Sequence, residues 1–218
     1  MSFSVMIFKM KNKAFITITL VLFALQIRAQ TVELYAGHKR AGVDLMWFKF
    51  FQNPKGERSP FLYFSRNRAS VDYKNSPTAF GSTNAVSYNF RNGVGIVAVG
   101  SFVNAGLVPK AGVQYVKTQG DFLFFGWLVA DLKKKGNVDL FGMFRWQPPI
   151  NERWRWFSQL ELFPVYKPAS EEWNLTQRLR LGAKYQAWAA GGMADFNQSG
   201  PGISQTSANY GVFLRRDF

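Results

Sequence analysis

The strongest constraint on the fold of this chain is the alternation of side chains in two stretches, residues 153–162 and 175–185. In the first, tryptophan and leucine alternate with arginine, glutamine and glutamate; in the second, leucine, alanine and tyrosine alternate with threonine, arginine, glycine and lysine. Successive side chains of a strand point to opposite faces, so each stretch is predicted to form a strand with one apolar and one charged face. A water-soluble sheet has no need of so many charges facing inward, whereas a water-filled barrel lumen tolerates them.

The last ten residues, 209–218, are predicted to form another such strand. Its apolar face consists of Tyr210, Val212, Leu214 and Phe218, and its polar face of Asn209, Gly211, Arg215 and Asp217. A terminal phenylalanine, apolar residues at alternate steps and a tyrosine eight positions before the end resemble the C-terminal insertion signal of bacterial outer-membrane β-barrels. Arg216 departs from that pattern, because an apolar residue usually takes its position. The resemblance implies a Gram-negative outer membrane as the location and the outer-membrane insertion machinery as a partner.

The first 29 residues have the organisation of a secretory signal peptide. Lys9, Lys11 and Lys13 precede an apolar run over residues 14–25, and the small Ala29 follows. The run is shorter than the roughly 20 residues that a membrane-spanning helix needs. We therefore expect residues 1–29 to direct export through the Sec route and to be cleaved near Ala29, leaving residues 30–218 as a single barrel domain.

No stretch after Ala29 reaches 18 consecutive apolar residues, so a mature chain that crosses a membrane must do so as a closed barrel. The aromatic content of 17% fits the aromatic girdles of such barrels. The predicted fold is all-β, a closed antiparallel transmembrane β-barrel of about 12 strands. If residues 187–196 merge with the preceding strand, 10 strands result. Strand count and aromatic content also make the chain similar, in general layout only, to twelve-stranded small-solute channels.

Charge and composition exclude several function classes. The net charge of +14 falls to +10 when the four basic residues of the signal peptide are removed, and an exported basic chain meets lipid phosphates rather than nucleic acid. Membrane lipids and lipopolysaccharide are therefore the expected partners, and the lysine run at 133–135 is either a solvated loop or a lipopolysaccharide contact. The chain has no cysteine and a single histidine, His38, so we predict no thiolate or multi-histidine metal site and no cofactor.

The charged faces define a candidate site in the lumen. A hairpin around residues 167–172 with Val165 opposite Asn174 places Glu161 across from Arg178, Gln159 across from Arg180, and Arg155 across from Lys184. The last two are both basic and, with Arg145 on the preceding strand, would attract an anion. The candidate anion path consists of Arg145, Arg155, Glu161, Arg178, Arg180 and Lys184. The equally weighted alternative is that these residues form a salt-bridged plug with Asp44, Asp139 and Asp217.

Two further expectations concern the walls and the loops. Leu123, Phe125, Trp127 and Val129 are predicted to form a lipid-type face, while Phe48, Phe122, Phe124, Phe141 and Phe157 are expected to point inward and narrow the lumen. The polar stretch 67–84 is predicted to be the longest outer loop.

These patterns favour a passive channel for small solutes of unidentified nature, with anionic solutes as the hypothesis that the basic lumen residues suggest, or a structural barrel. An alternative is a lipid-modifying enzyme in which His38 acts as a base for the hydroxyl of Ser65 or Ser87. A second alternative is an adhesion or assembly role for the loop at 67–84.

Overall fold

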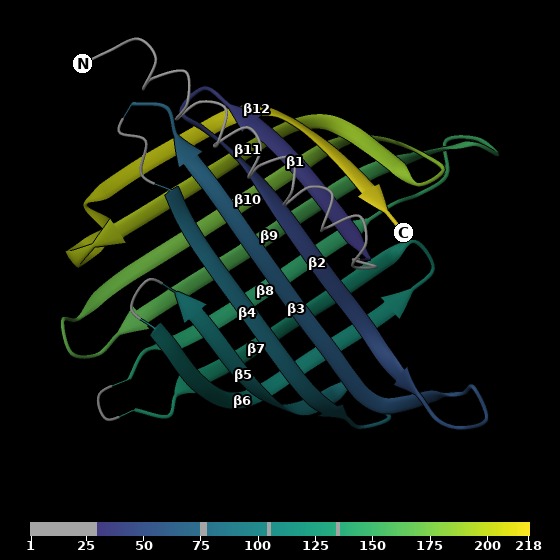
Figure 1. Cartoon of the computed structure of the whole chain (residues 1–218), viewed down its shortest axis with the longest axis horizontal. Coiled ribbons are helices and arrows are strands. Elements are labelled where there is room, and N and C mark those ends of the chain that lie inside the picture. The colour runs from purple at the N-terminus through teal and green to yellow at the C-terminus, as the bar shows by residue number, and fades with distance from the viewer. Residues whose placement is uncertain (1–29, 75–77, 104–105, 134–135) are drawn as a thin grey trace, which may run out of the picture.

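Twelve antiparallel strands close into one barrel in the computed structural model, which describes residues 30–74, 78–103, 106–133 and 136–218 (Figure 1). The strands are β1 (Thr31–Gly37), β2 (Arg40–Gln52), β3 (Arg58–Asp72), β4 (Thr78–Asn89), β5 (Val94–Val103), β6 (Gly106–Gln119), β7 (Phe122–Asp131), β8 (Val138–Trp146), β9 (Trp154–Lys167), β10 (Glu172–Tyr185), β11 (Trp188–Gly200) and β12 (Gln205–Asp217). One short 3-10 helix, η1 (Pro201–Ile203), lies between the last two strands. The prediction of twelve strands is confirmed, and the stretch 187–196 belongs to a strand of its own.

Each strand pairs with its neighbours in sequence, and β1 pairs with β12 to close the barrel. The closing ladder runs from Thr31 opposite Asp217 to Gly37 opposite Gly211. A Cβ at position 211 would lie 2.0 Å from the carbonyl oxygen of Ala36, so the approach of the two strands requires glycine there. The predicted signal peptide, residues 1–29, lies outside the described residues, among which no helix is long and apolar enough to cross a membrane.

The connections divide between the two ends of the barrel. Those that follow odd-numbered strands lie at one end, which we call the distal mouth, and those that follow even-numbered strands lie with the C-terminus at the other, the proximal mouth (Figure 1). The predicted long loop at 67–84 is wrong, because β3 continues to Asp72 and β4 begins at Thr78. Serine and asparagine in this stretch were read as loop residues, but their backbone is paired in the ladder from Asn67 opposite Ser82 to Val71 opposite Thr78.

The outer wall of the barrel is apolar. Large hydrophobic side chains on most strands are exposed, and on β12 they include Tyr210, Val212, Leu214 and Phe218, as predicted. Such a continuous apolar belt, which no soluble monomer exposes, is the lipid-facing surface of a transmembrane barrel. Arg216 shares this face, and its guanidinium lies 5.2 Å from the ring centre of Trp188 and 4.6 Å from that of Phe218. Aromatic rings therefore hold the one residue that departs from the apolar pattern of the last strand.

The interior is filled, and it is divided into an apolar half and a charged half. The apolar half is a cluster of buried side chains on β2 to β8: Met46, Leu62, Phe64, Ala85, Val97, Val99, Val116, Phe125, Trp127, Val129, Phe141 and Met143. Leu123, Phe125, Trp127 and Val129 thus face inward, and their predicted lipid-facing position is wrong. Of the phenylalanines expected to point inward, Phe48, Phe141 and Phe157 do so, whereas Phe122 and Phe124 face outward on β7.

Candidate functional site in the charged half of the lumen

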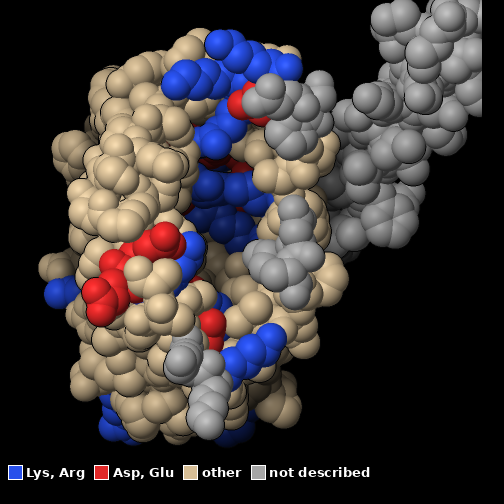
Figure 2. All heavy atoms as spheres, turned by 90° about the vertical axis from the view of Figure 1, so that its left-hand side faces the viewer, with Lys and Arg blue, Asp and Glu red and all other residues tan. Residues whose placement is uncertain are grey.

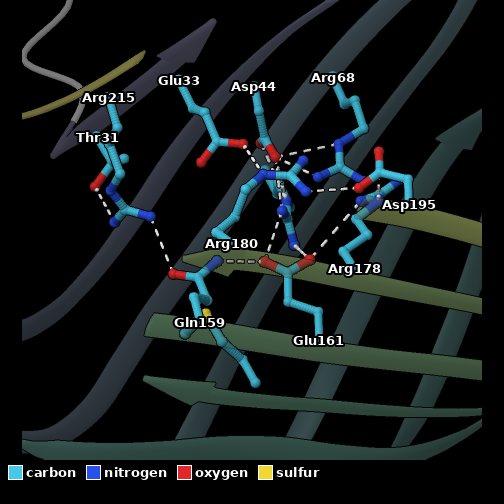
Figure 3. Close-up of polar contacts among 12 residues, drawn as sticks. Thr31, Glu33, Asp44, Arg68, Gln159, Glu161, Arg178, Arg180, Asp195 and Arg215 are labelled. Carbon is cyan, nitrogen blue, oxygen red and sulfur yellow. Dashed lines mark hydrogen bonds and ion pairs between the residues drawn. The ribbon is translucent and has the colours of Figure 1, made fainter. Parts of the chain in front are cut away.

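Eight charged side chains from six strands meet in the middle of the barrel and form what we call the central cluster (Figure 3). They are Glu33 on β1, Asp44 on β2, Arg66 and Arg68 on β3, Glu161 on β9, Arg178 and Arg180 on β10, and Asp195 on β11. Each occupies an inward position of its strand, because the side chains on either side of it along the strand face the outer wall. The pairing that closes β1 onto β12 brings Glu33 to the strands at the end of the chain.

Arg66 spans the lumen. On one side its guanidinium binds Asp44, with Nη2 2.6 Å from Oδ2 and Nε 3.0 Å from Oδ1. On the other side it makes two parallel contacts of 2.9 Å with the carboxylate of Glu161. Strands β2 and β9 are not neighbours in the sheet, so this side chain joins opposite walls. Paired contacts of this kind fix the guanidinium in position as well as binding it.

Arg180 makes a second bridge near the seam of the barrel, by which we mean the junction where β1 pairs with β12. Its Nε lies 2.8 Å from Glu33, and its Nη1 lies 2.6 Å from Asp195. All three side chains are at most 6% exposed. Arg178 lies nearer the solvent, 3.8 Å from Glu161 and 4.0 Å from Asp195.

The central cluster is electrically balanced and tightly packed. Its four arginines face four carboxylates, so it carries no net charge. The larger of the two cavities beside it, lined by Thr31, Glu33, Asp44, Met46, Arg66, Gln159 and Arg215, has about 10 Å³ of free space. That is room for about one water molecule. The lumen is therefore closed at this level by side chains, and a solute can pass only if they move.

A second group of charges, the proximal cluster, lies between the central cluster and the proximal mouth. Arg145 and Arg215 both donate to Oε1 of Gln159, over 2.8 and 3.0 Å. Asp217 binds Lys184 and accepts from Nε of Arg215 at 2.9 Å. Lys184 and Arg215 bind the carboxylate and Arg145 binds Gln159, so the three cations exceed the one carboxylate of this group by two positive charges.

The register predicted for the hairpin is confirmed. Val165 pairs with Asn174, and the predicted partners of Glu161, Gln159 and Arg155 are all opposite them. The expectation that Arg155 and Lys184 lie together without compensation is wrong, because Arg155 binds Asp121 at the proximal mouth and Lys184 binds Asp217. The sequence argument paired charges one by one only within this hairpin; it assigned Asp217 to the plug without a specific partner and did not consider Asp121.

Some of the ion pairs that the plug alternative expected are present, although the members differ. Asp44 and Asp217 do pair with lumen cations. Asp139 instead joins Asp131 around the ammonium of Lys110, at 2.5 and 2.8 Å, near the distal end of β6, β7 and β8. This triad lies on the opposite wall from the central cluster.

The sequence argument missed four members of the central cluster. Arg66 and Arg68 lie at the edge of, or inside, the stretch that was taken for a loop, although their spacing of two residues already put them on one face of a strand. Glu33 alternates with Val32 and Leu34 and was placed on a strand but given no partner. Asp195 lies in a glycine- and alanine-rich strand whose pattern is weak.

The distal mouth is a basic depression. Figure 2 looks into it and shows lysine and arginine atoms at the floor of a hollow. Among the cluster arginines, Arg178 and Arg68 have the largest side-chain exposure, at 22% and 16%. Figure 2 also shows acidic atoms on the rim, so the positive charge is concentrated at the floor of the hollow rather than around the whole mouth.

His38 lies in the turn between β1 and β2 and is exposed. Its Nδ1 accepts from the backbone nitrogen of Tyr210 at 3.0 Å, and its ring stacks on the Tyr210 ring. Ser65 lies opposite Trp47, seven residues along β2 from Arg40 at the turn, which corresponds to about 23 Å at 3.3 Å per residue. Ser87 is farther still, opposite Leu62. The structure therefore does not bring either hydroxyl to His38, and the predicted enzyme site is not assembled.

No family model and no curated protein matches the chain. Among solved structures, it is similar to the KdgM porin in complex with disordered oligogalacturonate, at 13% identity and a TM-score of 0.46 over 86% of this chain and 98% of that one. A second structure of the KdgM porin gives 15% identity and a TM-score of 0.44, over 86% and 98% of the two chains. A mutant of the Rh. blastica porin gives 9% identity and a TM-score of 0.26, over 86% and 97%. Outer-membrane porins are thus among the structures that this barrel resembles, as the sequence predicted.

Proposed function

We propose that this protein is an outer-membrane channel for small solutes whose path runs through the charged half of the lumen and is closed in the conformation described. The observation that supports the proposal is the bridge made by Arg66 between Asp44 and Glu161 across the lumen. The apolar half is packed around Phe125 and Met143, both fully buried, and offers no alternative route. Water that enters the charged half can replace the hydrogen bonds that separated ion pairs lose, whereas an interlocked apolar cluster cannot open without exposing its surface to water.

We propose anions as the preferred solutes. The distal mouth presents arginines, the central cluster is neutral, and the proximal cluster has three cations for one carboxylate. A channel lined by an excess of positive charge lowers the energy of a passing anion and raises that of a cation. The same charges support lipopolysaccharide phosphates as a contact at the distal rim.

A structural barrel is the second candidate, and the filled interior favours it. A barrel of this kind would have the same central cluster as a permanent plug, held closed by the network of buried ion pairs. The two functions differ in whether the cluster ever opens.

Replacing Arg66 with alanine is expected to open the channel. Hydrogen bonds to charged groups contribute about 1.5–3 kcal/mol each, and about 1.4 kcal/mol is a factor of ten in an equilibrium, so the open fraction should rise about tenfold or more. Single-channel recording in planar bilayers measures this fraction directly. We expect rare, brief openings from the unmodified protein. In a potassium chloride gradient these openings should be selective for anions. The selectivity should decrease in Arg145→Gln, because this change removes one of the excess cations.

Arg68→Ala is the matched control. Arg68 also binds Asp44 and lies on the same strand, but it makes no contact with Glu161, so the bridge across the lumen survives its loss. An increase in open fraction that is equal in the two variants would exclude the bridge as the gate. Complete absence of openings in the unmodified protein and in Arg66→Ala would leave the structural barrel.

The outer-membrane location, export by a signal peptide cleaved near Ala29, and recognition by the insertion machinery are further parts of the proposal. The exposed row of Tyr210, Val212, Leu214 and Phe218 on the closing strand supports recognition of that strand.

Deleting Phe218 is expected to reduce insertion of the barrel severalfold, because the last ring of the row and one side of the Arg216 contact are lost together. Folded barrels run differently on gels before and after boiling, and the fraction that shifts in isolated outer membranes measures insertion. Phe218→Tyr, which keeps the ring, should insert normally. Normal insertion of the deletion variant would show that the terminal residue is not part of the signal.

A further inference from the structure

We propose that the outward face of β3 and β4 is an interface at which a second copy of this chain binds within the membrane. The basis is a patch of five polar side chains in the middle of the lipid-facing wall, which we call the wall patch. Its members are Tyr63, Ser65 and Asn67 on β3 and Ser82 and Asn84 on β4; Ser65 is buried beneath its neighbours, and the other four are partly or fully exposed.

The position of the wall patch in the bilayer follows from its neighbours on the same strands. Toward the distal mouth the outward positions hold Val71 and Phe80, and toward the proximal mouth they hold Phe61 and Val86, all of them exposed and apolar. The patch is therefore flanked by apolar side chains along its own strands, while on β2 the exposed Lys49 pairs with Tyr63 at its proximal corner. Lipid chains offer no hydrogen-bonding partner to the groups that lie within the apolar belt.

The side chains of the wall patch bond to one another but retain free hydrogen-bonding groups. Asn67 donates to Ser65 at 3.2 Å, Asn84 donates to Ser82 at 3.1 Å, and Asn84 accepts from the hydroxyl of Tyr63 at 3.0 Å. An amide has two N–H donors and an acceptor oxygen. Among the contacts of the described residues, each asparagine uses one N–H, so a second donor on each and the oxygen of Asn67 remain. In hydrocarbon such groups are costly, and only another polar protein surface satisfies them.

The wall carries small residues on the β5 side of the patch, which lets a second barrel approach there, whereas on the β2 side Trp47 pairs with Ser65. Gly100 on β5 pairs with Asn84, and Ala98 on β5 pairs with Ala111 on β6, so these small residues continue the outward face beyond the patch. Elsewhere at corresponding outward positions the wall carries large side chains such as Leu140, Leu160 and Val212. Small residues at membrane interfaces allow backbones to come close.

A second copy fits this surface because the patch contains both hydrogen-bond donors and acceptors, so two identical patches can bond to each other. Amide and hydroxyl groups both donate and accept, so a copy related by a two-fold axis through the patch presents an acceptor to each free donor. Two-fold contacts between identical patches are the commonest form of self-association. The wall patch is separate from the charged lumen, so this interface is independent of the channel.

Disulfide trapping tests the interface, and the absence of native cysteine makes single-cysteine variants unambiguous. Ser82→Cys is a nearly isosteric change within the patch, and Val212→Cys is the control at an apolar, exposed position on β12. In proteoliposomes of the purified protein and in native outer membranes, mild oxidation should convert most of Ser82→Cys to a covalent dimer and little of Val212→Cys. Adding Asn67→Leu and Asn84→Leu to Ser82→Cys should reduce the dimer at least severalfold while the gel shift on boiling persists.

Three results would overturn the proposal. One is a folded Ser82→Cys protein that remains monomeric in both membranes. Another is equal trapping of the two single-cysteine variants, which indicates random collision. The third is trapping in native membranes only, to a different protein, which assigns the patch to another partner.

Discussion

Replacing Arg180 with methionine is expected to lower the free energy of unfolding by about 3–5 kcal/mol, the usual cost of removing one partner from a buried ion network. Arg180 is 3% exposed and binds both Glu33 and Asp195, so its loss leaves two carboxylates buried together without a cation between them. Urea unfolding of the protein in lipid vesicles, followed by tryptophan fluorescence, measures the difference.

Two controls distinguish the loss of the ion-pair network from the loss of the packing of the Arg180 side chain. Arg155→Met removes an ion pair with Asp121 that is about 40% exposed, and we expect a loss below about 1 kcal/mol. Combining Arg180→Met with Glu33→Gln and Asp195→Asn should restore much of the stability, since the uncompensated charges are gone. A triple variant as unstable as the single one would mean that the packing of Arg180, rather than its charge, is what matters.

Replacing Phe125 with alanine is expected to lower the free energy of unfolding by about 3–5 kcal/mol, because the change leaves a cavity in a close-packed cluster. Phe125 is fully buried, with its ring centre 4.9 Å from that of Phe48 and 5.2 Å from that of Phe64. Urea unfolding in lipid vesicles measures this loss as well. A change in channel activity would be a second sign that the cavity has formed.

Phe124→Ala is the matched control on the next residue. Phe124 faces the lipid, which fills the space that its ring leaves, so we expect a smaller loss of about 1–2 kcal/mol. The two variants differ only in which face of β7 they truncate. If Phe124→Ala were the more destabilising of the two, the orientation of β7 would be reversed.

The fold could be predicted from sequence because, in most strands, the alternation of apolar and polar residues shows which face points inward. On β9 and β10 the alternation of leucine or tryptophan with arginine and glutamate is so regular that the residue-by-residue register followed from one turn. A one-residue slip would move the whole charged set into the lipid. On β12 the same logic gave the outward row that ends at Phe218.

On β7 that logic fails, because phenylalanine and leucine occupy both faces. Periodicity cannot orient a strand whose two faces are equally apolar, and only the packing of Phe125 against Phe48 and Phe64 decides the question. The prediction expected some aromatic residues to narrow the lumen but placed Phe125 and Trp127 on the lipid face. The apolar half of the interior shows that this barrel also uses them as a core.

Only some members of the central cluster could be predicted from sequence. Glu161, Arg178 and Arg180 came from the strand with the clearest alternation and its neighbour, but their partners Glu33 and Arg66 lie far away in the chain, and Asp195, opposite Arg178, lies on the weakly patterned β11. A pairing argument that works across one hairpin cannot see contacts across the lumen. Arg66 and Arg68 were hidden for a further reason, since serine and asparagine on the wall patch gave their strand the composition of a loop.

The contacts across the seam between β1 and the end of the chain also have a kinetic consequence. Arg180 with Glu33, Arg215 with Thr31, and Thr31 with Asp217 join residues 147, 184 and 186 positions apart, so none can form until the first and last strands meet. Contacts that are absent until the final step do little for the rate of assembly and act mainly on the rate of disassembly. The charged seam therefore works as a latch, which sets how long a closed barrel lasts rather than how fast it forms.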